Sequence, residues 1–409
     1  MPDILKPRDD KDVVAAIEWA AAEGKTLEIV GEGSKHRIGR AAQWDLTLDL
    51  SGLTGVSLYE PEELVLSARA GTRLEEILSL VARNGQELAF EPMDYGPILG
   101  LPPGRGTLGG ALAANLSGPR RIKAGAARDH FLGVAAASGR AELFKSGGRV
   151  VKNVTGYDLC KVLAGSWGTL AAMTEVTIKI LPRAETEETL LVPRLDDQAA
   201  VRAMAAAMGS SADVSGAAHL TAATASRLAD AAAIGGAVTA LRLEGVPPSI
   251  AHRKRTLAAL LEPFGATDSL AETSSRALWR SIRDVTPFAA TDAGTAPPLW
   301  RISTAPMKGP QIAAQIAAEC AGAEVIYDWA GGLLWIMLAI QDDAGAATVR
   351  RAVRAAGGHA TLVRAAAPVR AIVDVFEPQE GALAALTRRV KESFDPRRVL
   401  GPGRMYAGV

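Results

Sequence analysis

The stretch Pro102–Gly118, PPGRGTLGGALAANLSG, contains residue types suited to binding an anion. Glycine lets the backbone approach a ligand closely, and the first N–H groups of a helix carry a partial positive charge. Thr107 is expected to cap a helix that begins near Leu108. The stretch holds five glycines: Gly104, Gly106, Gly109, Gly110 and Gly118. It therefore suits a diphosphate or another anionic ligand, although a tight turn into a closely packed helix explains it equally well.

A second glycine segment, GEGSKHRIG, follows a short expected strand at Leu27–Val30. Its Gly/Ser backbone and Lys35 suit contacts with phosphate oxygens. The dinucleotide fingerprint G-x-G-x-x-G needs a third glycine where this chain has His36, and no G-x-x-x-x-G-K-[ST] sequence occurs. These spacings exclude a Rossmann loop and a P-loop, and a turn that binds nothing remains open.

A third segment runs from Gly147 to Pro182. Asp158 is expected to open a short helix that ends at Gly165, and GSWGTL then leads into a strand at Thr174–Ile180. Glycines on both sides of Trp167 again allow close approach, and the indole offers an aromatic face. A core aromatic is the simpler interpretation of Trp167 alone.

The remaining pattern up to residue 182 mixes helices and strands without strict βαβ alternation. Asp12 is expected to cap a first helix. Thr72 and Glu75 have the spacing of a capping box for a helix over 73–84. The runs 131–137 and 142–145 are typical of a hairpin.

Composition changes after Pro182, where alanine-rich helical patterns alternate with strands and no glycine-rich anion loop occurs. This rhythm predicts a separate α+β domain. The helices are expected at 196–208, 250–261, 274–283 and 310–320, and the strands at 238–243, 299–303, 324–329 and 333–339. A last helix is expected at 380–393.

Composition also limits the partners and the compartment. The formal net charge is zero, which gives no electrostatic basis for binding nucleic acid. The two cysteines form no CxxC pair, and a reduced, cytosolic compartment is expected. The longest apolar run, Gly331–Ile340, is far shorter than the roughly 20 residues that span a bilayer, so no transmembrane segment is expected.

In this order and spacing, the three glycine segments resemble those of FAD-binding flavoproteins of the vanillyl-alcohol oxidase/p-cresol methylhydroxylase (VAO/PCMH) type. The terminal FDPRRVLGPGRM is similar to the family's closing motif, except that Gly401 stands where Asn is common. The resemblance covers the middle of the chain only loosely. It implies an α+β protein with a two-part FAD-binding domain at 1–182, an α+β cap domain at 183–370, and a C-terminal segment at 371–409 that returns to the FAD domain.

Carried over residue by residue, the resemblance implies FAD contacts from three loops and one strand. The first loop supplies Gly31, Glu32, Gly33, Ser34 and Lys35; the second supplies Pro103, Gly104, Thr107, Gly109, Gly110, Asn115, Ser117 and Gly118; the third supplies Asp158, Gly165, Gly168 and Thr169; and Val176 lies where a strand backbone meets the adenine end. Some members attach the flavin covalently through His, Cys or Tyr. His36 and His130 are lone histidines, so non-covalent FAD is expected.

Within the family, the segments 151–170 and 357–364 make the chain most similar to the FAD-binding subunits of bacterial glycolate oxidase complexes. This implies oxidation of glycolate, a 2-hydroxy acid, to glyoxylate, with electrons passing through the flavin to an iron–sulfur subunit. A larger homologous flavin subunit is the other expected partner. The expected location is cytoplasmic, with any contact at the inner face of the membrane made through these partners.

The catalytic residues stay open. Oxidation of a 2-hydroxy acid needs a hydride acceptor, a base and a cation for the carboxylate. Arg301 and Arg404 are the candidates for that cation. The family's metal-using dehydrogenases carry a His-x-His pair, whereas the cap histidines here are isolated (His219, His252 and His359), so no metal site is expected. A flavin electron-transfer or assembly subunit without turnover, and a stand-alone dehydrogenase, remain alternatives.

Overall fold

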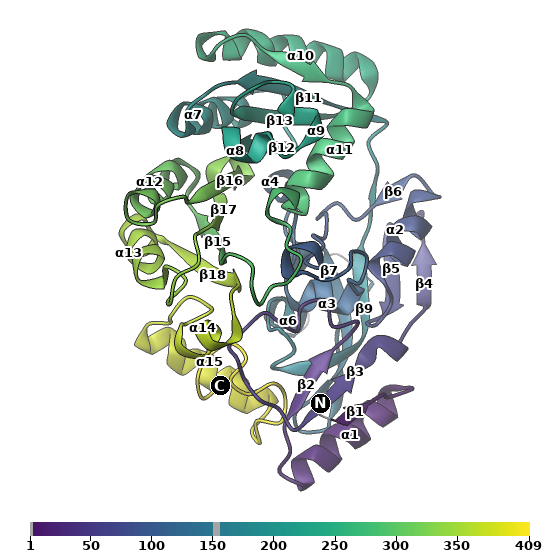
Figure 1. The fold of residues 1–409 in the computed structure, drawn as a ribbon. Helices are drawn as coiled ribbons and strands as arrows, with labels where there is room; N and C mark the ends of the chain where they lie inside the picture. The colour runs from purple at the N-terminus through teal and green to yellow at the C-terminus, as the bar shows by residue number, and fades with distance from the viewer. Residues whose placement is uncertain (1–2, 150–155) are drawn as a thin grey trace.

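The computed structural model describes residues 3–149 and 156–409, so residues 151–155 of the motif at 151–170 lie outside the described residues. Strands before residue 183 and the last helix, α15 (Gly381–Phe394), form the lower part of the molecule in Figure 1. Later strands form one antiparallel sheet above it. Both termini lie in the lower part (Figure 1). The predicted α+β class is confirmed.

A small parallel sheet carries the first glycine loop. It has the order β1 (Asp3–Leu5), β3 (Leu46–Asp49), β2 (Leu27–Val30), and α1 (Asp10–Ala22) packs beside it. The prediction that Asp12 caps α1 was wrong. The backbone of Asp9 is extended, and its carboxylate accepts from the Asp12 N–H at 2.9 Å. The helix therefore begins one turn earlier, and the Asp12 carboxylate binds Arg8.

An antiparallel sheet carries the second and third turns. Its order is β4 (Val56–Glu60), β5 (Val65–Arg69), β9 (Ala171–Lys179), β7 (Phe131–Ser138), β8 (Leu143–Gly147), which confirms the predicted hairpin. The helices α2 (Leu74–Ala82), α3 (Leu108–Ala113) and α6 (Leu159–Leu163) share its apolar core. The capping box at Thr72 was wrong, because the Thr72 hydroxyl bonds to the backbone of Gly55 instead. Arg73 precedes α2 without a side-chain cap.

The upper sheet has eight strands in the order β14-β11-β13-β12-β16-β17-β15-β18, from the top of Figure 1 downward. Its strands are β11 (Thr186–Pro193), β12 (Gly216–Leu220), β13 (Val238–Gly245), β14 (Asp268–Leu270), β15 (Leu299–Thr304), β16 (Glu324–Asp328), β17 (Leu333–Met337) and β18 (Gly358–Arg364). Its main helices are α7 (Asp197–Met208), α10 (Pro247–Leu261), α11 (Glu272–Arg283), α12 (Gly309–Glu319) and α13 (Ala346–Ala356). The predicted helices and strands of this region are confirmed with small shifts of their ends, whereas α13 was not predicted.

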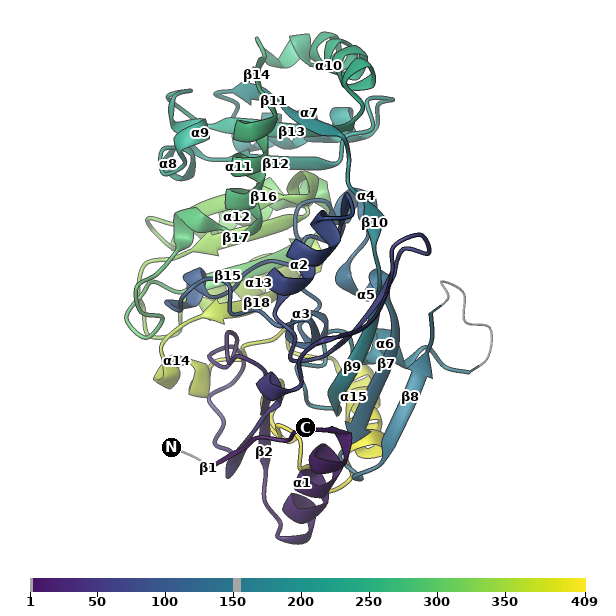
Figure 2. The ribbon, with the colours of Figure 1, turned by 90° about the vertical axis from the view of Figure 1, so that its right-hand side faces the viewer.

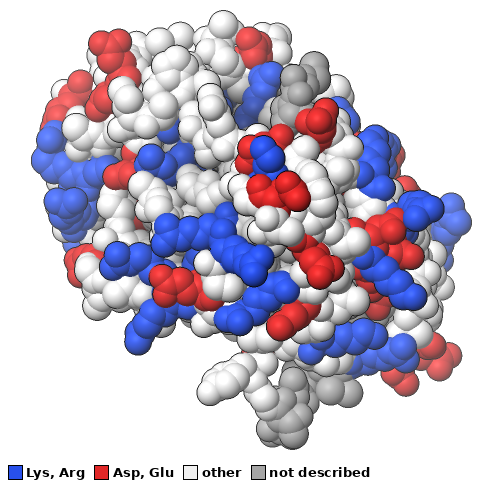
Figure 3. Space-filling model, turned by 90° about the horizontal axis from the view of Figure 1, so that it is seen from below, with Lys and Arg blue, Asp and Glu red and all other residues white. Residues whose placement is uncertain are grey.

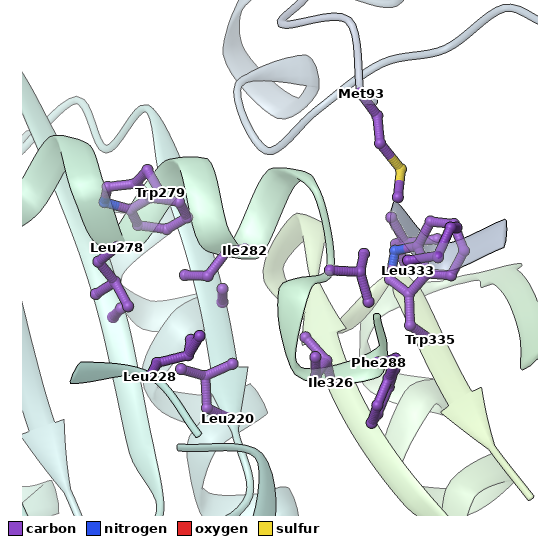
Figure 4. Packing of buried hydrophobic residues seen from close by; sticks show 14 of the residues in the cluster. Met93, Leu220, Leu228, Leu278, Trp279, Ile282, Phe288, Ile326, Leu333 and Trp335 are labelled. Atoms are coloured by element: carbon purple, nitrogen blue, oxygen red, sulfur yellow. The ribbon is translucent and has the colours of Figure 1, made fainter. Parts of the chain in front are cut away.

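The two faces of this sheet pack against different layers. Alternate residues show this in β11, where Leu190 and Val192 pack with α7 and α10, and Leu191 lies in another cluster with Trp279 of α11. That second cluster also includes Met93, which comes from the lower part. Figure 4 shows Met93 directed at Trp335 and Leu333 of β17. The lower part is thus packed directly on the lower strands of the sheet, as the turned view in Figure 2 also shows.

The C-terminal tail runs alongside β2, the strand that precedes the first glycine loop. The N–H of Leu27 donates to Val399 O at 2.7 Å, and the N–H of Gly401 donates to Leu27 O at 2.8 Å. The buried ammonium of Lys391 donates to Asp395 at 2.8 Å and to Thr169 O at 2.7 Å. On the face seen in Figure 3, positive and negative side chains are interspersed. The domain limits at residues 182 and 370 stay a prediction.

Candidate functional site

An open cleft lies where the three glycine turns meet. Its lining takes residues from β2 and the loop after it, from the start of α3, from the Trp167 turn, and from the tail. The predicted residues in the lining are Gly31, Glu32, Gly33, Ser34, Lys35, Thr107, Gly109, Gly110, Gly168 and Arg404. The turns at 31–35, 103–118 and 165–169 are separated by more than 40 residues of sequence, so only the tertiary fold brings them together.

The turns touch so closely that side chains at the glycines would collide. A Cβ on Gly31 would lie 2.7 Å from the hydroxyl oxygen of Thr107, and one on Gly168 would lie 3.2 Å from the Cβ of Ile29. Gly168 also has a φ of +77°, which favours glycine. Trp167 N–H donates to Ala113 O at 2.9 Å and ties the third turn to α3. The predicted cap is confirmed, because Thr107 Oγ1 accepts from the Gly110 N–H at 3.2 Å.

The first loop offers donors to an anion. The backbone N–H groups of residues 32–35 donate to no other group in the described part of the chain. The Lys35 ammonium donates to Ser34 Oγ at 2.9 Å, and burial lowers the pKa of Lys35 to about 8. The carboxylate of Glu32 forms ion pairs with Arg73 and Arg105, each at 3.3 Å, so its negative charge is balanced. Unbonded donors beside a partly buried cation are what a diphosphate requires.

The rest of the cleft wall is mainly apolar. It includes Ile29, Leu50, Ala70, Ala113, Ala171, Met173 and the indole of Trp167. Such a wall suits aromatic rings, which lose little by leaving water. Together with the donors of the first loop, these residues fit an FAD molecule. Sequence reasoning missed Leu50, Ala70 and Met173, because an apolar strand residue that lines a cleft does not differ in type from one in a core.

Arg404 and His36 lie at the polar side of the cleft. Arg404 is 5% exposed, donates to Lys35 O at 3.2 Å and lies 3.7 Å from the carboxylate of Glu28. The rings of Trp44 and Trp167 are within about 6 Å of its guanidinium. His36 is exposed, and its Nδ1 lies 2.6 Å from Gly33 O. Arg404 thus lies against the first loop, on the FAD side of the molecule.

The other predicted residues are not part of the cleft lining. Asn115 accepts from the Arg128 N–H at 3.0 Å through its side chain, and Ser117 accepts from the Ala127 N–H at 2.9 Å. Gly104 N–H donates to the carboxylate of Asp94 at 2.7 Å. These contacts position the turns, and a role in binding FAD stays a prediction for each residue. The remaining residues of this group are Pro103, Gly118, Asp158, Gly165, Thr169 and Val176.

Several of these remaining residues have clear structural contacts. The O of Gly118 accepts from the Trp329 indole at 3.0 Å. Asp158 caps α6, as predicted. Thr169 donates to Ser166 O at 2.7 Å. Val176 is fully buried in the centre of β9, between β5 and β7. Pro103 is exposed on the loop before α3.

The upper sheet presents Arg301 toward the lower part. Its guanidinium lies 5.1 Å from the ring centre of Trp329 and 6.0 Å from that of Trp335. Arg121 of α4 (Arg121–Ala124), from the lower part, lies 4.2 Å from the same Trp329 ring. Neither Arg121 nor Trp329 was singled out from the sequence, because nothing local distinguishes them from other surface and core residues.

The histidines do not gather into a site. His219 is fully buried, bonds to Thr239 Oγ1 at 2.9 Å and lies 3.3 Å from the carboxylate of Asp197. His130 is also buried, and its Nε2 lies 2.9 Å from Ala124 O. Among residues 3–149 and 156–409, no three His, Cys, Asp or Glu side chains are grouped as metal ligands would be. Over the same residues, no helix is both long and apolar enough to cross a membrane.

Comparison with known proteins supports the FAD assignment. The sequence model of the FAD binding domain matches residues 3–147. The glycolate oxidase subunit GlcE of Escherichia coli is 31% identical over 392 residues, which cover 96% of this chain and 95% of that protein. The D-lactate dehydrogenase of Archaeoglobus fulgidus is 29% identical over 198 residues, which cover 46% of this chain and 41% of that protein.

The fold is also that of solved flavoproteins. The structure of p-cresol methylhydroxylase with substrate bound superposes with a TM-score of 0.71 over 98% of this chain and 88% of that chain, at 11% identity. Alkyldihydroxyacetonephosphate synthase gives a TM-score of 0.71 over 98% of this chain and 76% of that chain, at 15% identity. These similarities confirm the VAO/PCMH-type fold. Because the identity to GlcE extends over nearly the whole of both proteins, the chain belongs to the GlcE family of FAD-binding oxidoreductases, whose wider relatives include D-lactate and D-2-hydroxyglutarate dehydrogenases.

Proposed function

We propose that this protein is the FAD-holding subunit of a complex that oxidises a short 2-hydroxy acid, with glycolate as the expected substrate and glyoxylate as the product. The observation that carries the proposal is the cleft in which three distant glycine turns meet and in which, among residues 3–149 and 156–409, the N–H groups of residues 32–35 have no acceptor. The identity to GlcE over the full length supports the choice of glycolate. In this view residues 1–182 and 371–409 hold FAD, and residues 183–370 form the cap.

The residues of the cleft would hold the cofactor in distinct ways. The free N–H groups of the first loop and the Lys35 ammonium would bind the diphosphate, which needs donors more than it needs several buried cations. The apolar wall would exclude water from the rings. Bound FAD supplies hydride acceptance and stepwise electron release, which no side chain offers. His36 bonds within its own loop and His130 is buried, which supports non-covalent binding.

A partner role is proposed for the electron path. We infer that electrons leave through an iron–sulfur subunit and that a larger homologous flavin subunit completes the complex. The similarity of the chain to a protein named as a subunit supports this, as does its partial similarity to glycolate oxidase subunit GlcD of Bacillus subtilis, 26% identical over 193 residues. Any association with the inner face of the membrane would come through these partners. A subunit without turnover of its own remains the alternative.

Anaerobic mixing tests the proposal. The purified chain is reconstituted with FAD and mixed with glycolate or D-lactate while the visible flavin band is followed. Bleaching by the chain alone supports an active site of its own, and bleaching only with the partner subunits supports the complex. A chain that stays colourless after incubation with FAD would refute the proposal. Denaturation that releases all flavin into the supernatant is the expected sign of non-covalent binding.

A further inference from the structure

Two arginines from different parts of the molecule meet on one indole ring. Arg121 lies on α4, beside the second glycine turn, and Arg301 lies on β15 of the upper sheet. Their guanidinium carbons are 4.2 and 5.1 Å from the ring centre of Trp329. The helix α4 contacts β12 and the Trp329 turn, η6 (Trp329–Gly331), which directly follows β16. The pair therefore spans the junction between the two parts.

Neither guanidinium has a counter-ion in the described part of the chain. No carboxylate lies within ion-pair distance of Arg121 or Arg301 among residues 3–149 and 156–409. The nearby acids are engaged elsewhere: Asp129 accepts from the Ala126 N–H at 2.9 Å, and Asp328 accepts from the Trp329 N–H at 2.7 Å. The Arg121 side chain is exposed, whereas Arg301 is partly buried. Burial of part of the Arg121 side chain and the charge of Arg301 lower the pKa of Arg121, and the charge of Asp129 opposes them. An anion bound close to both arginines would relieve this repulsion.

The indole leaves the donors of both arginines available. A guanidinium that stacks on a ring uses its flat face, so its N–H groups in the plane stay free for a carboxylate. Trp329 is held in place by its indole bond to Gly118 O and by its backbone. Trp329 and Ala330 have φ values of +51° and +57°, which are costly for residues other than glycine. Backbone strain maintained beside unpaired cations is typical of a functional site.

Tyr95 is a further polar residue on the Arg301 side of this cluster. The Tyr95 ring packs edge-on against Trp335 at 6.1 Å, and the charge of Arg301 acts on its hydroxyl. That hydroxyl bonds to no other residue in the described ranges. We propose that Arg121 and Arg301 form a site for the carboxylate of a small organic acid, with Trp329 as its platform and the Tyr95 hydroxyl beside it. The inference rests on the proposed function for the identity of the acid, but not for the binding of an anion.

Oxalate, a two-carbon dianion that offers no hydrogen for oxidation, is the probe. The FAD-reconstituted chain is titrated with oxalate while tryptophan fluorescence and the visible flavin spectrum are followed. Saturable binding is expected for the natural chain. Arg121→Met and Arg301→Met should each raise the Kd about ten- to a hundredfold, because each removes hydrogen bonds between charged groups. Arg121→Lys should keep part of the affinity.

Two controls isolate the charge at this site. Arg354→Met removes an exposed arginine of α13 and should leave the oxalate Kd unchanged. Glycolamide, which is uncharged, should bind weakly to every variant. Thermal melting and FAD content check that each variant is folded. Oxalate binding that is absent in the natural chain, or equal in Arg121→Met, overturns the proposal.

The proposed function can fail separately. If no 2-hydroxy acid bleaches the flavin with or without partners, yet oxalate binding depends on Arg121 and Arg301, the anion site stands and the proposed function does not. If glycolate is oxidised but oxalate binding does not change in either arginine variant, the function stands and the anion site does not.

Discussion

Replacing Gly31 by alanine would push two of the three glycine turns apart. An alanine Cβ at this position would lie 2.7 Å from the Thr107 hydroxyl and 3.1 Å from the Thr107 methyl carbon. Ordinary contact begins at 3.4 Å, so the hydroxyl would have to retreat by about 0.7 Å. Thr107 is buried and caps α3 through the Gly110 N–H. The substitution therefore disturbs the cleft and the helix start together.

The expected loss has two parts. Extra volume in a packed site costs about 1–3 kcal/mol, and a weakened cap costs about 1 kcal/mol more. Part of this free-energy cost lowers the stability of the flavin-free protein. The rest weakens FAD binding, because the turns must close on the ligand. We expect the Kd for FAD to rise about ten- to a hundredfold, which is about 1.4–2.8 kcal/mol. The melting temperature should fall as well.

Titration of the flavin-free chain with FAD measures this directly, by calorimetry or by quenching of flavin fluorescence. Gly381→Ala is the matched control, because the same methyl group at the start of α15 meets no atom within 4 Å. Thr107→Ser in the Gly31→Ala background removes the crowding methyl group and should restore part of the affinity. An unchanged Kd in Gly31→Ala would mean that FAD does not lie between these turns.

Three further outcomes are expected. Because burial lowers the pKa of Lys35 to about 8 and a bound phosphate favours the protonated form, FAD affinity should fall above about pH 8 by up to about tenfold per pH unit. Lys35→Met should abolish that dependence in the same titration. Burial raises the pKa of Glu91, but the charges of Arg242 and Arg120 outweigh it and lower the pKa to about 2. The ionised Glu91 carboxylate therefore stabilises the fold above pH 4.5, the usual pKa of glutamate, and this contribution is lost as the pH falls toward 2. Urea unfolding should show Glu91→Gln less stable by about 3–5 kcal/mol at neutral pH, with a flatter acid limb; equal acid sensitivity would contradict this. Lys391→Met leaves the fully buried Asp395 without its cation and should cost about 3–5 kcal/mol, seen as a lower melting temperature; a melting temperature like that of the natural chain would show that the pair contributes nothing.

The glycine turns were predictable because their signals are local. Glycine spacing, the Thr107 cap and the Asp158 cap are properties of a few neighbouring residues, and the structure places all of them as expected where it tests them. The predictions that Asp12 and Thr72 cap helices failed because another partner competes at each position. Asp9 competes for the same helix end, and the Thr72 hydroxyl finds a backbone partner 17 residues away.

The alanine-rich region limited prediction in another way. The helix α13 (Ala346–Ala356) was missed because alanine marks neither face of a helix strongly, although Val349 and Val353 prove to be buried. The apolar wall of the cleft was missed because Leu50 and Met173 look like core residues. In the Arg121–Trp329–Arg301 contact, Arg121 is 180 residues before Arg301 and 208 before Trp329, and nothing in the chain marks them as neighbours.

By itself the sequence determined that three glycine-rich, donor-rich turns exist, that the second opens a short helix and the third leads into a strand, and that two kinds of α/β organisation follow one another along the chain. Only the tertiary structure decided which side chains face the common cleft, which charged groups lack ion-pair partners, and which distant residues contact each other. The physical reason is that backbone freedom and capping are set by a few adjacent residues, whereas burial, pairing and desolvation depend on atoms brought together from the whole chain.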